Sequence, residues 1–230
     1  MKRFEVLKER VWKCNLELFN KNLVVHTFGN VSGVDRNEGI IAIKPSGIKY
    51  SDLKSEDMVL IDFENNVIDS KLKPSTDSKT HILLYKSFKN IGGVAHTHSP
   101  FATAWAQARK PIPCFGTTQA DHIRGEIPCT KDLTAKQISR NYEIETGNQI
   151  VKKLRSSNSE KSGMILVAGH GPFSWGMDPE EAVYNTIMLE EIAKISWYTI
   201  SINPEAKPIS KKLIDKHFLR KHGEKAYYGQ

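Results

Sequence analysis

The chain has 230 residues, of which 39% are hydrophobic and 26% are charged, with a formal net charge of +7. This composition is typical of a soluble globular protein, and the length favours one large domain spanning residues 1–230. The three cysteines are widely separated and form no CxxC pair. They therefore argue against a disulfide framework or a cysteine zinc finger, and they favour a reducing, cytoplasmic location.

The charge and hydropathy patterns disfavour two kinds of partner. No basic run is interleaved with aromatic residues in the pattern of a nucleic-acid-binding module, so we expect no nucleic-acid partner. No apolar h-region follows the charged N-terminus, and the most apolar long stretch, 186–202, is interrupted by charged side chains. We therefore expect neither a secretory signal nor a membrane span. A mildly positive field favours an anionic small molecule as substrate.

The first part of the chain predicts one helix followed by short strands. Apolar residues at helical spacing predict a helix over 2–19. Runs of strand-favouring residues bounded by turn residues predict strands over 23–27, 31–35, 40–44 and 58–63. Thr76 is expected to cap a helix that continues through Leu84 and Phe88. The short turns between the early strands favour antiparallel pairing.

The second part of the chain is dominated by helix-start signals. Such signals occur at three places, Ser99-Pro100, Thr134-Ala135-Lys136-Gln137 and Asp178-Pro179. The first predicts Ser99 as the cap and Pro100 as the first residue of a helix over 101–108, and the third predicts a long helix that ends near Tyr198. A last helix is expected over 211–221, ended by Gly223. The whole pattern predicts an α/β fold, with three layers (α/β/α) and a mainly antiparallel or mixed central sheet.

Three histidines form the most informative pattern of the sequence. An apolar run that ends in Val94-Ala95 leads into His96 and His98, and side chains two residues apart on a strand point to the same face. His170 follows a second apolar run, 164–168. Three protein ligands with one open position are typical of a catalytic zinc site. Because imidazole sites accept several divalent ions, the pattern indicates a metal site without selecting the metal.

Three loops of small polar residues offer a second kind of chemistry. They contain Thr27-Phe28-Gly29-Asn30, Lys44-Pro45-Ser46-Gly47 and Lys73-Pro74-Ser75-Thr76-Asp77. Hydroxyls, backbone N–H groups and a lysine charge suit a phosphate monoester, and the third loop lies at an expected helix N-terminus. The role of Asp77 is ambiguous in the sequence. A carboxylate in the first turn of a helix is favourable by itself, and it could also serve as a metal ligand or a general acid/base.

Nine motifs extend in order over nearly the whole chain: TFGNVS, IKPSG, KPSTD, HTHS, GTTQAD, IPCT, ETGN, HGPFSWG and the tail DKHFLRKHGEKAYYGQ. On these motifs the chain resembles the class II aldolase/adducin family, and within it the L-ribulose-5-phosphate 4-epimerases.

This resemblance implies a role for each matching residue. The metal positions are matched by His96, His98 and His170, with Asp77 as the acidic residue at the metal. The phosphate-binding positions are matched by Gly29, Asn30, Ser46, Gly47, Ser75 and Thr76, with Lys44 close by. An acid/base pair, which in this family reaches the site from a neighbouring subunit, is matched by Asp121 and Tyr228. Positions that line or support the site are matched by Thr117, Glu143, His217 and Arg220.

The resemblance also implies a reaction. A Zn²⁺-dependent epimerase of this kind interconverts L-ribulose 5-phosphate and D-xylulose 5-phosphate. It breaks the C3–C4 bond to give dihydroxyacetone enediolate and glycolaldehyde phosphate, and rejoins them with inverted C4. Zinc as a Lewis acid stabilises the enediolate, and two groups on opposite faces handle the protons. The implied assembly is a homotetramer with shared active sites.

Two other readings remain open at this point. An aldolase of the fuculose-phosphate type shares the histidines and the phosphate loops, but it would release its aldehyde and typically carries glutamate at the position of Asp77. A non-catalytic adducin-like interaction module is the other alternative, and it would require a decayed metal site.

Overall fold

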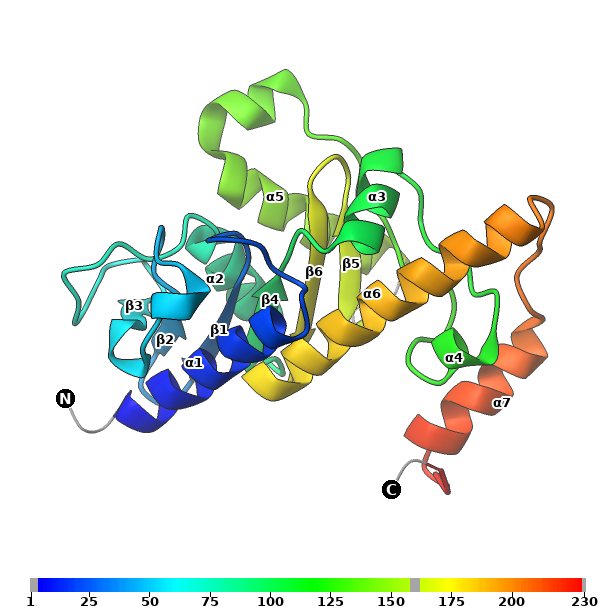
Figure 1. Cartoon of the computed structure of the whole chain (residues 1–230), viewed down its shortest axis with the longest axis horizontal. Helices are drawn as coiled ribbons and strands as arrows, with labels where there is room; N and C mark the ends of the chain where they lie inside the picture. The colour runs from blue at the N-terminus through cyan, green and yellow to red at the C-terminus, as the bar shows by residue number, and fades with distance from the viewer. Residues whose placement is uncertain (1–3, 158–161, 229–230) are drawn as a thin grey trace.

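A six-stranded antiparallel sheet lies at the centre of the computed structural model, which describes residues 4–157 and 162–228 (Figure 1). The strands are β1 (Asn30–Asp35), β2 (Ile40–Ile43), β3 (Val59–Asp62), β4 (Gly93–His96), β5 (Met164–Val167) and β6 (Gly171–Gly176). Their order across the sheet is β3-β2-β1-β4-β6-β5, and every neighbouring pair is antiparallel. The expected α/β class and antiparallel pairing are confirmed.

Helices cover both faces of this sheet and create the expected three layers. The helices are α1 (Glu5–Asn20), α2 (Ser78–Ser87), α3 (Pro100–Ala108), α4 (Thr117–Ala120), α5 (Ala135–Ser157), α6 (Pro179–Ile202) and α7 (Lys211–His222). One hydrophobic cluster joins the sheet to α2 and α5. Two further clusters join it to α1, α3 and α6 on the opposite side. The core therefore has two halves, one on each side of the sheet.

Strand β2 shows why the sheet needs helices on both faces. Ile41 and Ile43 pack in the cluster with α2 and α5, whereas Ile40 and Ala42 pack in the cluster with α1 and α6. Successive strand side chains point to opposite faces, so a run of four apolar residues has no solvent-facing side. All four residues are buried. This continuous apolar run is what allowed the strand to be predicted within one residue.

The predicted strand over 23–27 is wrong. This segment is a loop, because His26 within it has a positive φ (55°), which an extended strand does not allow, and Asn22 just before it has another (57°). Leu23 and Val24 are nevertheless buried against the α1 side of the core. Their apolar character reflects this burial and not strand pairing. The helix predicted over 2–19 is confirmed from Glu5 onward, while its first two residues lie outside the described residues.

The helix starts differ in how their backbone N–H groups are satisfied. The predicted helix starts at Thr134 and Asp178 are confirmed, because each side chain accepts a hydrogen bond from the backbone N–H three residues later. Thr76 is not the cap of α2, since Asp77 occupies that position. Helix α3 begins at Pro100 as predicted, but its N–H groups are capped from a distance by the carboxylate of Glu190 on α6.

The last helix stands apart from the three layers. Figure 1 shows α7 beside the short α4, at the end of the molecule reached by the C-terminal half of α6. The predicted α7 and its end at Gly223 are confirmed, whereas the predicted α6 is four residues too short. Helix α5 is interrupted at Asn141, whose φ and ψ of −155° and 90° are not helical. Within the described residues, no helix combines the length and apolarity that a membrane crossing needs.

Candidate active site

One edge of the sheet gathers most of the residues singled out by the sequence. In the antiparallel register Asn30, at the start of β1, lies opposite His96, at the end of β4. His96 in turn lies opposite Phe173 on β6, and the turn between β5 and β6 carries His170. Strand pairing thus places the first small-residue loop one strand away from the histidines, although they are far apart in sequence.

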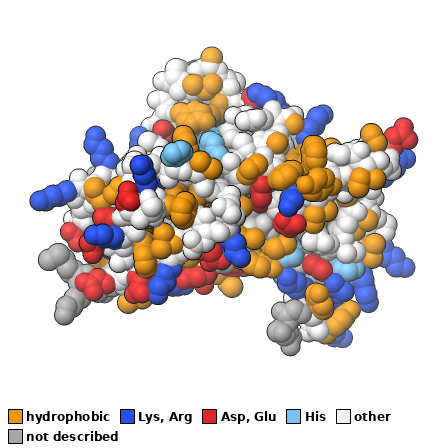
Figure 2. Space-filling view, in the orientation of Figure 1, with side chains coloured by type: hydrophobic (Ala, Val, Ile, Leu, Met, Phe, Trp, Pro, Cys, Tyr) orange, Lys and Arg blue, Asp and Glu red, His pale blue; other side chains and the backbone are white. Residues whose placement is uncertain are grey.

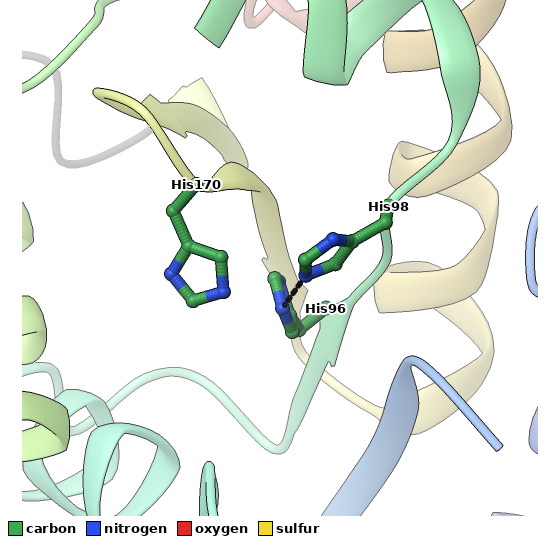
Figure 3. A group of neighbouring side chains, drawn as sticks. All are labelled: His96, His98 and His170. Atoms are coloured by element: carbon green, nitrogen blue, oxygen red, sulfur yellow. Dashed lines mark hydrogen bonds between the residues drawn. The ribbon is translucent and has the colours of Figure 1, made fainter. Parts of the chain in front are cut away.

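The three histidine rings converge in this region (Figure 3). The Nε2 atoms of His96 and His98 are 3.2 Å apart, and one ring nitrogen from each of the three residues lies within 4.8 Å of the others. His96 donates its Nδ1–H to the carbonyl oxygen of Pro172 at 2.8 Å, which leaves the lone pair of its Nε2 directed at the other rings. Burial lowers the pKa of His98, and it lowers the pKa of His170 to about 3.

These histidines fit a divalent metal ion. Two nitrogen ligands at about 2.0–2.1 Å from one tetrahedral ion are roughly 3.3 Å apart, close to the His96–His98 separation. Metal ligands must be neutral imidazoles, and the lowered pKa values of His98 and His170 keep these rings neutral near pH 7. The arrangement can hold a metal through three ligands and leave coordination positions open toward the cavity.

Asp77 lines the same cavity, but it is hydrogen-bonded to Asn30 and not to one of the three histidines. Its Oδ2 accepts a hydrogen bond from the side-chain amide of Asn30 at 2.8 Å, and that amide also donates to Ser75 Oγ at 3.0 Å. Burial alone would raise the pKa of Asp77, but the nearby His96 and His81 and the bond from Asn30 hold that pKa below its ordinary value. Among the described residues, the group that could share one ion contains the three histidines and not Asp77.

The two lysine-containing loops are joined to each other by backbone hydrogen bonds. The Ser46 N–H donates to the Lys73 carbonyl at 2.9 Å, and the Ser75 N–H donates to the Lys44 carbonyl at 3.1 Å. Ser46 and Thr76 are exposed at the rim of the cavity, whereas Ser75 is buried in the Asn30–Asp77 network. The exposed hydroxyls are therefore the ones best placed to meet an anionic group.

Lys44 is almost completely buried in the wall of the cavity, with 1% of its surface exposed. Its ammonium donates to the carbonyl of Ile48 at 2.9 Å and lies 4.8 Å from the centre of the Tyr50 ring. Burial lowers the pKa of Lys44 to about 8. The Tyr50 hydroxyl donates to the Gly29 carbonyl at 2.8 Å, so it supports the first loop, where Gly29 has a φ of +80° that few other residues adopt.

A cavity of about 350 Å³, a size typical of small-molecule sites, brings these parts together. Twelve of the predicted site residues line it: Gly29, Asn30, Lys44, Ser46, Gly47, Ser75, Thr76, Asp77, His96, His98, Glu143 and His170. Sequence reasoning missed Tyr142, which also lines the cavity. Its position beside Glu143 was the only available signal, because helical spacing does not reveal which side chains line a cavity.

The other predicted site residues form a separate cluster between α4 and α7. Asp121 accepts hydrogen bonds from Arg220 at 2.9 and 3.1 Å and from His217 at 3.0 Å. Burial favours the neutral acid, but these partners hold the pKa of Asp121 below its ordinary value. The Tyr228 ring lies over the Arg220 guanidinium at 4.1 Å, and Thr117 begins α4.

This second cluster does not line the cavity. Figure 2 shows histidine side chains at two places on this face of the molecule, one below α5 and the other over α4 and α7. The predicted acid/base pair, Asp121 and Tyr228, is therefore brought together around one arginine, but within a single chain it lies apart from the three histidines.

Residues 9–197 match the family described as the Class II Aldolase and Adducin N-terminal domain. With this match over most of its length, the chain belongs to the class II aldolase/adducin family. The class II aldolases of this family typically depend on a divalent metal, which agrees with the histidine geometry. Family membership also indicates an enzyme, without deciding between a lyase and an isomerase.

Solved structures with the same fold include several aldolases. An L-fuculose 1-phosphate aldolase is 23% identical, with a TM-score of 0.79 over 92% of this chain and 93% of the other. The L-fuculose 1-phosphate aldolase from Glaciozyma antarctica is 17% identical, with a TM-score of 0.78 over 96% and 84%. That from Thermus thermophilus is 22% identical, with a TM-score of 0.70 over 89% and 100%. At these identities the likeness establishes the fold.

Proposed function

We propose that this protein is a metal-dependent L-ribulose-5-phosphate 4-epimerase, with residues 1–230 acting as one domain. The observation that carries the proposal is the cavity in which three convergent histidines and the exposed hydroxyls of the small-residue loops face the same space. A ligand held there would have one end near a cation and the other near phosphate-binding groups. A ketose 5-phosphate has this polarity, since its C2 carbonyl and its phosphate lie at opposite ends.

In the proposed reaction, His96, His98 and His170 hold a divalent metal, for which we propose Zn²⁺. When bound, the metal supplies a Lewis acid that polarises the substrate carbonyl. The hydroxyls of Ser46 and Thr76, with the nearby charge of Lys44, hold the phosphate. Anchoring the phosphate keeps the aldehyde fragment in the cavity after the C3–C4 bond breaks, so that it can turn over and rejoin.

Two proton-handling groups are needed, one for each face of the aldehyde. We propose Asp121 and Tyr228 for this pair, supplied to each cavity by a neighbouring subunit of a homotetramer. The separation of their cluster from the cavity of their own chain supports such sharing. Thr117, His217 and Arg220 would then act by holding this pair in place, through the hydrogen bonds and ring contact described above.

A class II aldolase of the fuculose-phosphate type is the second candidate, and it is favoured by the similar solved structures, three of which are L-fuculose 1-phosphate aldolases. The short carboxylate of Asp77 favours the epimerase, because such aldolases typically carry the longer glutamate at this position. Asp77 lines the same cavity as the three histidines but lies outside their group, so we propose that it is the acidic residue beside the metal.

The decisive experiment supplies the zinc-loaded protein with L-ribulose 5-phosphate and, in parallel, with L-fuculose 1-phosphate. Formation of D-xylulose 5-phosphate, without net release of dihydroxyacetone, supports the epimerase. Cleavage of L-fuculose 1-phosphate, or net accumulation of dihydroxyacetone, would replace it with the aldolase. A protein that binds no metal and turns over neither substrate would instead fit a non-catalytic interaction module.

A further inference from the structure

Tyr142 contacts the histidine group from helix α5. Its hydroxyl oxygen lies 3.1 Å from His170 Nδ1, and the two ring centres are 5.9 Å apart. The side chain lines the cavity and is 38% exposed. Tyr142 comes from α5, whereas His170 comes from the β5–β6 turn, so this contact spans two elements that are separated in sequence.

The backbone at Tyr142 is held firmly. Helix α5 breaks at the preceding residue, Asn141, which redirects the chain at this point. The Tyr142 carbonyl accepts the hydroxyl of Thr146 at 2.8 Å, and the next carbonyl, of Glu143, accepts the hydroxyl of Thr80 on α2 at 2.6 Å. These bonds tie the start of the second helical segment to its own next turn and to a neighbouring helix. The tyrosine ring is therefore presented from a fixed support.

His96 shows what such a partner does for a histidine of this group. Its Nδ1–H is taken by the Pro172 carbonyl, which directs the Nε2 lone pair at the other rings. His170 points its Nε2 the same way in Figure 3, and its Nδ1 has the Tyr142 hydroxyl in the place where His96 has a carbonyl. A partner on the outer nitrogen fixes both the tautomer and the orientation of a metal-binding histidine.

We propose that Tyr142 is a positioning residue, which accepts the Nδ1–H of His170 and so holds its Nε2 lone pair toward the shared centre. This inference rests on the proposed function, because it assumes that the histidines bind a metal. Because Tyr142 lies on α5, its hydroxyl ties the geometry of His170 to that helix.

The first test measures zinc affinity by competition with a chromophoric chelator. Tyr142→Phe keeps the ring and removes only the hydroxyl, and we expect its zinc affinity to fall by about 10- to 100-fold. Tyr184→Phe is the matched control, since it removes a comparable tyrosine–histidine hydrogen bond, to His122 Nε2 at 2.8 Å, outside the cavity. Its zinc affinity should equal that of the wild type. Equal affinities for all three proteins would overturn the proposal.

A second test needs neither a variant nor a metal. Two-bond ¹H–¹⁵N correlation spectra of the wild-type protein, without added metal at pH 7.5, report the tautomer of each histidine. We expect His170 to carry its proton on Nδ1. A proton on Nε2 would overturn the proposal even if the protein binds zinc. If the wild-type protein binds no zinc but His170 carries its proton on Nδ1, the proposed function fails, whereas the tyrosine contact is upheld.

Discussion

At the scale of single residues, the proposed metal site requires that the three histidines hold their ring nitrogens close enough to share one ion. His98 is the most exposed of the three histidines, and its ring packs beside Phe28, with ring centres 6.1 Å apart. It contributes to the site without contributing to the core. Its removal should therefore affect metal binding far more than folding.

We expect His98→Ala to lose stoichiometric zinc and at least about 100-fold in activity, because two imidazoles hold a divalent ion much more weakly than three. Metal analysis of the purified variant and a turnover assay measure the two losses. The melting temperature of the metal-stripped variant should match that of the metal-stripped wild type. Full activity in a variant that carries no metal would contradict the role of the histidines.

Lys44 gives a prediction for pH, because its pKa in the folded protein is about 8 instead of the ordinary 10.5. Between these two pH values the unfolded chain binds more protons at this site than the folded chain. The free energy of unfolding should therefore rise with pH across this range, by at most about 3 kcal/mol. Lys44→Met lacks the titrating group and should lack this rise.

Urea unfolding of both proteins between pH 7.5 and 10.5 isolates the contribution of Lys44, since all other groups titrate in both. The wild type should gain stability relative to Lys44→Met as the pH rises. Parallel curves would mean that the three backbone carbonyls around the ammonium compensate fully for its burial.

At the scale of elements, the site depends on close contact between β4 and the start of α6. A Cβ atom on Gly93, the first residue of β4, would lie 2.3 Å from the carbonyl oxygen of Asp178, the cap of α6. Neither backbone can move without disturbing its hydrogen bonds. The same strand ends in His96, so the glycine permits the packing that positions the first metal ligand.

Gly93→Ala should therefore lower the free energy of unfolding by about 2 kcal/mol or more, as overpacking against backbone does. Chemical denaturation measures the change. Gly116→Ala is the control, because a Cβ atom there would meet nothing within 4 Å and its φ of −154° is extended backbone. We expect less than about 1 kcal/mol for the control. Similar losses in the two variants would show that close packing is not the cause.

At the scale of the whole molecule, the two clusters of predicted site residues are separated. The histidines lie at one edge of the sheet, whereas Asp121, Arg220 and Tyr228 meet at the α4–α7 end, beyond the three layers (Figure 1). If both clusters act in one reaction, they must come from different chains. The proposed sharing of active sites between subunits can therefore be tested by measuring the activity of mixed oligomers.

Neither Asp121→Asn nor His96→Ala should be active by itself. Mixed oligomers of the two variants should regain activity, up to about one quarter of the wild-type value for random mixing, because some cavities then combine intact groups from two chains. Mass spectrometry verifies that mixed oligomers form, and a turnover assay measures the recovery. Verified mixed oligomers without activity would indicate that each subunit works alone.

An element could be predicted from the sequence where the interactions that form it are between neighbouring residues. Strand β2 was predictable because burial on both faces leaves a continuous apolar run. Residues 23–27 were mistaken for a strand because the buried Leu23 and Val24 leave the same apolar signal, and the positive φ of His26 is invisible in the sequence. The cap of α3 was missed because Glu190 reaches it from another helix.

The sequence by itself determined the placement of His96 and His98 together at the end of one strand, the helix starts at Thr134 and Asp178, and the motifs of the family, since each of these depends on neighbouring residues. Only the tertiary structure decided that Asn30 bonds to Asp77, that Tyr142 meets His170, and that Asp121 lies apart from the cavity. The two contacts join residues that are 47 and 28 positions apart in the sequence. They follow from strand order and helix packing, which depend on the whole chain at once.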